Sequence, residues 1–210
     1  RKPANWSITP GQMSASAGEA KPGRASQIYL VTIGQKALMS VTGVVLFGFV
    51  IAHMIGNLQV FLGRAKLNAY GELLHSMPGI LWTARIVLLA SVLLHAVLGL
   101  RLARLRGSAR PVAYAKKKNI GSTTSSRTMV VSGLLIFFFV IYHLLHFTLG
   151  NAHPSFIPGD VYHNVIAGFR VIPASIAYIV AMVGLGFHLN HGAWSMFQSL
   201  GVSHPRYTPM

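Results

Sequence analysis

The chain has 210 residues, 52% of them hydrophobic and only 10% charged, a balance that excludes an ordinary soluble domain and is typical of a polytopic membrane protein. Eighteen Lys and Arg residues against three acidic ones give a formal charge of +15, but a nucleic-acid-binding protein is excluded because it would not place half its residues in long apolar runs. The absence of cysteine excludes disulfides, thiolate metal sites and iron–sulfur ligation by this chain.

Residues 1–35 are polar and rich in Gly, Pro and Ser, which predicts a flexible basic tail without a cleavable signal peptide. Residues 36–210 are predicted to form one membrane-embedded bundle. Four apolar runs are long enough to cross about 30 Å of hydrocarbon at about 1.5 Å per residue, at roughly 37–62, 80–100, 129–149 and 171–196. Residues 68–77 are predicted to form an interfacial helix. The loop before the fourth run is predicted to mix turn with short amphipathic helix, braced by Asp160 and His163. The fold class is therefore all-α, a polytopic transmembrane helix bundle with four spans.

The charges of the connecting segments predict the orientation. Residues 1–36 contain five cations and residues 101–127 contain eight, including the run KKK at 116–118. Residues 63–79 contain two cations, and residues 150–170 contain one. Since cationic segments remain in the cytoplasm, the N-terminus and the connection between the second and third spans are predicted to be cytoplasmic.

Each predicted span contains a histidine within the hydrocarbon, where an imidazole is costly unless its nitrogens are engaged. His53 and His143 lie about 24–26 Å from the cytoplasmic ends of their spans. His95 lies about 9 Å from its cytoplasmic end, and His188 lies about 27 Å from the external end of its span. The four histidines therefore form an outer pair, on spans one and three, and an inner pair, on spans two and four.

Two imidazoles at one depth on two helices can ligate one haem iron from opposite faces. Glycines in the spans would let the macrocycle approach the backbone. Two haems at different depths would form a transmembrane path for electrons. The alternatives are packing histidines bonded to neighbouring carbonyls, or a proton relay in a transporter or channel. The relay is disfavoured because no carboxylate lies inside any span.

Four stretches of the chain resemble the diheme cytochrome b subunit of succinate:quinone oxidoreductases, the single-chain membrane anchor of bacterial complex II and fumarate reductase. Within about residues 33–210, they are GQKALMSVTGVVLFGFVIAHMIGNLQVFLG, RTMVVSGLLIFFFVIYHLLHFTLGN, DVYHNVIAGFR and GLGFHLNHGAWSMFQSLGVSHPRYTP. The resemblance implies a multi-pass anchor in the bacterial cytoplasmic membrane, docked beneath a flavoprotein and an iron–sulfur subunit, in a complex that can form a higher oligomer. It also implies electron transfer from succinate to a membrane quinone, usually menaquinone when two haems are present.

The resemblance places the ligands of two haem b groups on the same four histidines. The proximal haem, near the soluble subunits, would use His95 and His188, and the distal haem would use His53 and His143. The family has five spans, and the fifth would follow Met210, so the total number of helices stays open. No dicarboxylate site is recognised in this chain, so it would supply the quinone and haem half of the enzyme. The remaining alternative is a diheme cytochrome b that anchors another quinone-linked dehydrogenase, such as hydrogenase or formate dehydrogenase.

Further candidates surround these four ligands. His146 and His191 follow two of them at a spacing of three and either donate to a haem propionate, line a quinone pocket or bond to a neighbouring helix. Arg85 lies inside the second span near its external end, where it can pair with a distal propionate or extend to the interface. Glu72 and His75 are candidates for quinone binding and proton exchange, or are simply an exposed polar face.

Overall fold

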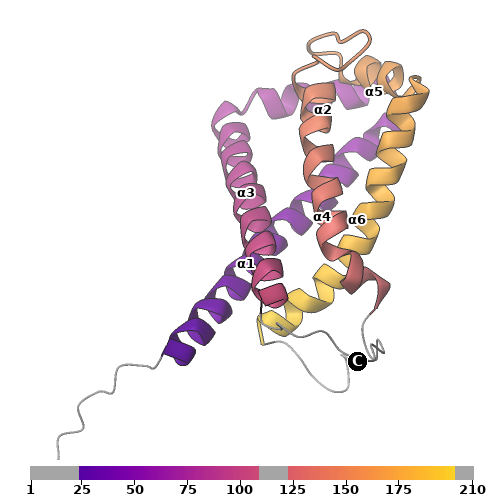
Figure 1. The fold of residues 1–210 in the computed structure, drawn as a ribbon. Coiled ribbons are helices and arrows are strands. Elements are labelled where there is room, and N and C mark those ends of the chain that lie inside the picture. Colours follow the sequence, from indigo (N-terminus) through magenta and orange to yellow (C-terminus); the bar gives the residue numbers. More distant parts are fainter. Residues whose placement is uncertain (1–23, 109–122, 202–210) are drawn as a thin grey trace, which may run out of the picture.

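The computed structural model describes residues 24–108 and 123–201, and these residues form helices and no strand (Figure 1). The helices are α1 (Arg24–Asn57), the 3₁₀ turn η1 (Leu58–Leu62), α2 (Arg64–His75), α3 (Pro78–Ser108), α4 (Thr124–His143), the π-helical turn η2 (Leu144–Thr148), α5 (Val161–Phe169) and α6 (Ile172–Ser199). The all-α prediction is confirmed.

Four helical segments are long and apolar enough to cross a membrane, as predicted: Val31–Leu62, Pro78–Gly107, Thr124–Thr148 and Ile172–Ser199. With 25 to 32 residues each, they extend about 38–48 Å, which exceeds the roughly 30 Å of hydrocarbon. This length and composition are those of a multi-pass membrane protein.

The predicted tail extended too far along the chain. Residues 1–23 lie outside the described residues, but residues 24–35, which were assigned to the tail, are helical and belong to α1. Pro22 and Gly23 directly precede the helix, and no proline follows them before the first span. Gly34 is the least favourable residue for a helix in that interval and costs about 1 kcal/mol, far less than a proline would, so the helix of the span extends backward to this pair.

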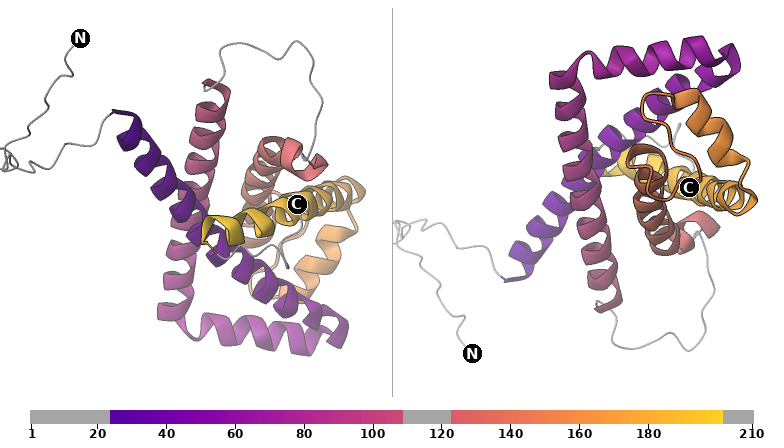
Figure 2. Two further views of the ribbon diagram at one scale, coloured as in Figure 1. Left: turned by 90° about the horizontal axis from the view of Figure 1, so that it is seen from below. Right: turned by 90° about the horizontal axis from the view of Figure 1, so that it is seen from above.

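The four long helices form two antiparallel hairpins, α1 with α3 and α4 with α6 (Figure 1). α1 crosses the bundle obliquely and also packs on α6, and α3 also packs on α4. α2 and α5 lie across the same end of the bundle, where they pack on each other (Figure 2). The helix predicted at 68–77 is confirmed as α2, which begins four residues earlier and ends two earlier, and the predicted helix in the loop before the fourth span is confirmed as α5.

The side chains are distributed as expected for a protein in lipid. Among the described residues, the buried apolar set is small: Leu67, Leu98, Ala174 and Ala181. Many large apolar side chains on the long helices are exposed instead, which is the arrangement that faces hydrocarbon. Several buried residues are polar, among them Thr42, Ser132 and His146, so the helix contacts are made largely by small and polar side chains.

Candidate functional site

The inner histidine pair lies between α3 and α6. The ring centres of His95 and His188 are 6.2 Å apart, and the ring planes are inclined by 62°. His95 Nδ1 lies 3.1 Å from the main-chain oxygen of Met39 and 3.1 Å from Thr42 Oγ1. Because a carbonyl can only accept, Nδ1 of His95 carries the proton and Nε2 keeps a free lone pair.

His188 is supported in the same way from α4. Its Nδ1 lies 3.3 Å from Ser132 Oγ, and the main-chain carbonyl of Met129 also interacts with the ring. The Ser132 hydroxyl donates its proton to the main-chain oxygen of Met129 at 3.2 Å, so Ser132 Oγ can accept the Nδ1 proton of His188. Each inner ring is therefore oriented by the first helix of its own hairpin, with Nε2 available to a metal.

These supports repeat along the chain. The stretch MSVTGVVLFGFVIAH at 39–53 and the stretch MVVSGLLIFFFVIYH at 129–143 have the same pattern, ninety residues apart. The repeat aligns Thr42 with Ser132 and the outer histidines with each other. It also aligns Gly43 with Gly133, where an added Cβ would lie 3.5 Å from His95 Cε1 and 3.4 Å from His188 Cε1. Thr42 and Ser132 were not predicted as site residues, and this repeat is the signal that could have identified them.

The outer pair lies between α1 and α4. The ring centres of His53 and His143 are 5.7 Å apart, and the ring planes are perpendicular. The His53 ring also stacks on Phe49, one turn earlier in α1, at 5.3 Å. The two rings that were predicted to share the outer depth therefore face each other, as do the two rings of the inner layer.

Tyr178 and His146 extend this outer pair through hydrogen bonds. The Tyr178 hydroxyl lies 3.1 Å from His143 Nδ1 and 3.1 Å from His146 Nδ1. His146 is 1% exposed and lies in the π-helical turn η2, where the chain is widened by a bond from Leu149 N to Leu144 O. Of the roles considered for His146, the structure shows a hydrogen bond to a neighbouring helix. Tyr178 was missed because nothing in the sequence indicates which side of its helix faces the histidines.

The structure places the other candidates apart from these rings. His191 is half-buried on α6, one turn beyond His188. The Arg85 guanidinium lies 5.0 Å from the centre of the Trp82 ring at the start of α3. Glu72 and His75 are exposed on α2, and His75 Nδ1 donates to the Gly71 oxygen at 2.8 Å. In the described part of the chain, no hydrogen bond or ring contact joins Arg85, Glu72 or His75 to the histidine pairs, whereas His191 interacts electrostatically with His188.

The predicted loop brace at Asp160 is a clamp between α2 and α5. The carboxylate accepts from Arg64 and, at 3.0 Å, from Asn68 Nδ2, both on α2. It also caps α5 by accepting from His163 N at 3.1 Å. The hydrogen bond from Arg64 is the main reason why the pKa of Asp160 lies well below its usual range, with Asn68 and His163 N adding to the effect.

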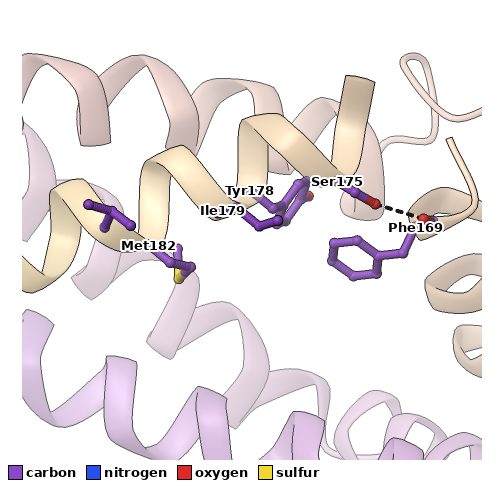
Figure 3. Close-up of a pocket in the computed structure, with 6 residues that line it drawn as sticks. Phe169, Ser175, Tyr178, Ile179 and Met182 are labelled. Atoms are coloured by element: carbon purple, nitrogen blue, oxygen red, sulfur yellow. Dashed lines mark hydrogen bonds between the residues drawn. The ribbon is translucent and has the colours of Figure 1, made fainter. Parts of the chain in front are cut away.

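Two cavities lie beside the outer half of α6. One of about 740 Å³ is lined by Phe169, Ser175, Tyr178, Ile179, Met182 and Val183 (Figure 3). The other, of about 310 Å³, is lined by residues that include Tyr142 and His146. Both are lined mainly by apolar side chains, so they suit hydrocarbon or a flat apolar group better than an ion.

The donor set fits a haem better than a bare metal ion. Among the described residues, no group of three or more His, Cys, Asp or Glu side chains could hold a metal by itself. Each layer instead supplies two facing imidazoles with ring centres 5.7 Å or 6.2 Å apart. A metal bound between two imidazoles would lie about 2 Å from each ligating nitrogen, and each ring centre lies roughly half a ring beyond its nitrogen. The two ring centres would then be about 6 Å apart, which is similar to the separations in this structure. Haem needs two such axial ligands because the macrocycle supplies the remaining nitrogens.

Comparison with known proteins finds a similar chain. The chain is 23% identical over 175 residues to the succinate dehydrogenase cytochrome b558 subunit of Bacillus subtilis (strain 168), a match that covers 80% of each chain. No family model matches the chain, and no solved structure matches it.

Proposed function

We propose that this chain is the membrane-anchoring cytochrome b subunit of a succinate dehydrogenase, and that it carries two haem b groups. The observation that supports the proposal most strongly is the presence of two facing histidine pairs, one in each layer of the bundle. The relative from Bacillus subtilis, a cytochrome b subunit of succinate dehydrogenase, points to the same function. The function would be electron transfer between soluble subunits and a membrane quinone.

In this proposal His95 and His188 hold the proximal haem, and His53 and His143 hold the distal one. Bound haem supplies an iron that gains and loses one electron at a time. The chain's own residues keep the inner imidazoles in the tautomer with a free Nε2, through oxygens on α1 and α4. The lipid-facing exterior of the helices keeps water away from both layers.

The partners follow from the ends of the bundle. The end of the bundle where α1 begins and α3 ends adjoins, in the sequence, the cationic stretches 1–36 and 101–127, so it would face the cytoplasm, where a flavoprotein and an iron–sulfur subunit would dock. The opposite end carries α2 and α5. Glu72 and His75 on α2 would bind a quinone there, menaquinone by the family resemblance, and exchange its protons with water. Arg85, near the same end, would pair with a distal propionate.

The proposal is tested by purifying the complex and recording reduced-minus-oxidised spectra with a redox titration. We expect two haem b components in the wild type. His53→Ala and His143→Ala should each remove the same component, and His95→Ala and His188→Ala should each remove the other. His163→Ala, on α5 outside both pairs, is the matched control and should keep both components.

Two results would overturn the proposal. Absence of a haem b spectrum would exclude a cytochrome, and loss of different components from His53→Ala and His143→Ala would exclude the pairing. Co-purification discriminates the nearest alternative, since a nickel- or molybdenum-containing partner would indicate a hydrogenase or formate dehydrogenase anchor instead of a flavoprotein complex.

A further inference from the structure

The two histidine layers are supported by different chemistry. In the inner layer, hydroxyl and carbonyl oxygens accept the Nδ1 protons of both rings. In the outer layer, His143 Nδ1 faces the hydroxyl of Tyr178, and that hydroxyl also faces His146 Nδ1 at the same distance of 3.1 Å. One phenol on α6 therefore joins two imidazoles that lie on successive turns of α4 and η2.

The number of protons decides how this triad can be arranged. A phenol has one proton, so Tyr178 can donate to only one of the two imidazoles. If it donates to His143, the proton of neutral His143 is on Nε2, which then has no lone pair for a metal. If it donates to His146, its oxygen can accept the Nδ1 proton of His143, and Nε2 of His143 is free. The oxygen could also accept from both rings, but the phenol proton would then have no acceptor among the hydrogen bonds that Tyr178 makes in the described part of the chain. Donation to His146 satisfies all three groups and leaves Nε2 of His143 free for ligation.

His146 is held where it can accept that proton. Its ring stacks on Tyr142 with centres 5.3 Å apart and planes inclined by 16°, and it packs on Phe147 at 4.2 Å. Gly168 of α5 closes the other side, because a Cβ there would lie 2.9 Å from His146 Cε1. An imidazole enclosed on all these sides at 1% exposure has little freedom to turn its Nδ1 away from the phenol.

The phenol itself is held from two sides. The ring of Tyr178 packs edge-on against Phe139 and against Phe169, with ring centres 4.8 Å apart in both cases. Phe169 is in turn fixed at the corner between α5 and α6, where its main-chain oxygen accepts from Ser175 Oγ at 2.7 Å (Figure 3). The hydroxyl of Tyr178 is thereby directed toward α4.

We infer that Tyr178 and His146 are positioning residues for His143: the phenol accepts the Nδ1 proton of the distal ligand, and His146 accepts the proton of the phenol. The inference rests on the proposed function, since it assigns His143 to a haem iron. It also gives the outer layer a property that the inner layer lacks, because the ligand's hydrogen bond there depends on a second imidazole.

The consequence is electronic as well as structural. An imidazole that donates its Nδ1 proton to an oxygen is a more basic ligand, and a more basic ligand favours ferric over ferrous iron. Tyr178→Phe keeps the ring and removes only the hydroxyl. We therefore expect a rise in the reduction potential of the distal haem, a change in its ferric electron paramagnetic resonance signal, and about 10–100-fold weaker retention of that haem. The proximal haem should not change.

A pair of substitutions at His146 separates the hydrogen bond from packing. In His146→Leu the phenol loses its acceptor, and its proton can compete for His143 Nδ1, so loss of distal haem should resemble that in Tyr178→Phe. In His146→Gln the side-chain carbonyl can accept the phenol proton, so the distal potential and haem content should return toward the wild type. Tyr142→Phe, which keeps the ring stacked on His146 and removes only its hydroxyl, is the matched control and should leave both haems unchanged.

The measurements are made on the purified complex with both haems resolved by redox titration and electron paramagnetic resonance. Unchanged distal potential and signal in Tyr178→Phe would overturn the inference, and so would equal shifts of both haems. Failure of His146→Gln to differ from His146→Leu would also overturn it. Absence of haem from the wild-type complex would instead contradict the proposed function, so the two failures are distinguishable.

Discussion

The main-chain oxygen of Met39 accepts the Nδ1 proton of His95 across the interface of α1 and α3, at 3.1 Å. The contact joins a ring on α3 to the main chain of α1, so the orientation of the ring depends on how these two helices pack. Thr42 Oγ1 reinforces it from the next turn, and Ser132 does the same for His188 in the second hairpin.

Removal of these hydroxyls should weaken the inner layer. Thr42→Val and Ser132→Ala each delete one oxygen that accepts from an inner imidazole, and each should reduce retention of the proximal haem about 10-fold, with a larger loss in the double variant. Haem content and a redox titration of the purified complex measure the effect. Ser40→Ala is the matched control, because Ser40 is a buried serine on the same helix whose hydroxyl donates to the Lys36 oxygen and, among the described residues, makes no hydrogen bond to a histidine. Selective loss of the distal haem would contradict this prediction.

Gly168→Ala should destabilise the end of the bundle that carries α2 and α5. The added Cβ would lie 2.9 Å from His146 Cε1 and 3.0 Å from Phe147 Cε1, so α5 or the π-helical turn must move. Overpacking of this kind costs about 1–3 kcal/mol. Thermal unfolding of the detergent-solubilised protein measures the cost, and Gly192→Ala, where nothing lies within 4 Å of the added atom, is the control. Equal unfolding temperatures for the two variants would show that the site has more room than the structure gives it.

Asp160→Asn should loosen the contact between α2 and α5 in a pH-dependent way. Because Arg64 lowers the pKa of Asp160, the ionised carboxylate favours the folded state above its ordinary pKa of 3.8, and this contribution disappears only as the pH falls through the lower folded value. The difference in stability between wild type and Asp160→Asn should therefore be constant from pH 8 to about pH 5 and shrink below about pH 4. Unfolding curves over a pH series test this. A stability difference between the two proteins that grows as the pH falls would contradict this prediction.

Glu72→Gln should slow quinone turnover without disturbing the haems. If Glu72 exchanges protons with quinone, loss of its carboxylate should reduce the rate of quinone reduction about 100-fold or more. Haem spectra should stay unchanged, because Glu72 is exposed on α2 and contacts neither histidine pair. Glu72→Asp retains a carboxylate and should keep much of the activity. Full activity in Glu72→Gln would contradict a role for Glu72 in proton exchange with quinone.

The long elements and the pairing of histidines could be predicted because both depend on distance along a helix. Hydrophobic length identifies a span, and rise per residue gives the depth of His53 or His188 without knowledge of how any helix is rotated. The predicted start of the first helix was wrong, because the polar residues that precede the apolar run can continue its helix when no proline interrupts it.

The supporting contacts could not be predicted because they depend on rotation and on local helix geometry. Whether Tyr178 faces α4 or lipid is decided by how α6 packs, and an apolar helix surrounded by lipid has no polar face to indicate this. The π-helical turn also changes the direction of His146 relative to an ordinary helix, which a spacing of three residues does not reveal. The contact of Arg85 with Trp82 is different, because the two residues lie three apart on α3 and that spacing already places them on one helix face.

The ninety-residue repeat has a consequence for how such a protein is assembled. Each hairpin contributes one outer and one inner histidine, so neither hairpin has both axial ligands for a haem within one layer. On the proposed ligation, each haem would join one helix of the first hairpin to one helix of the second, with one haem in each layer. Each haem would thus add a link between the two hairpins to the packing of α1 on α6 and of α3 on α4.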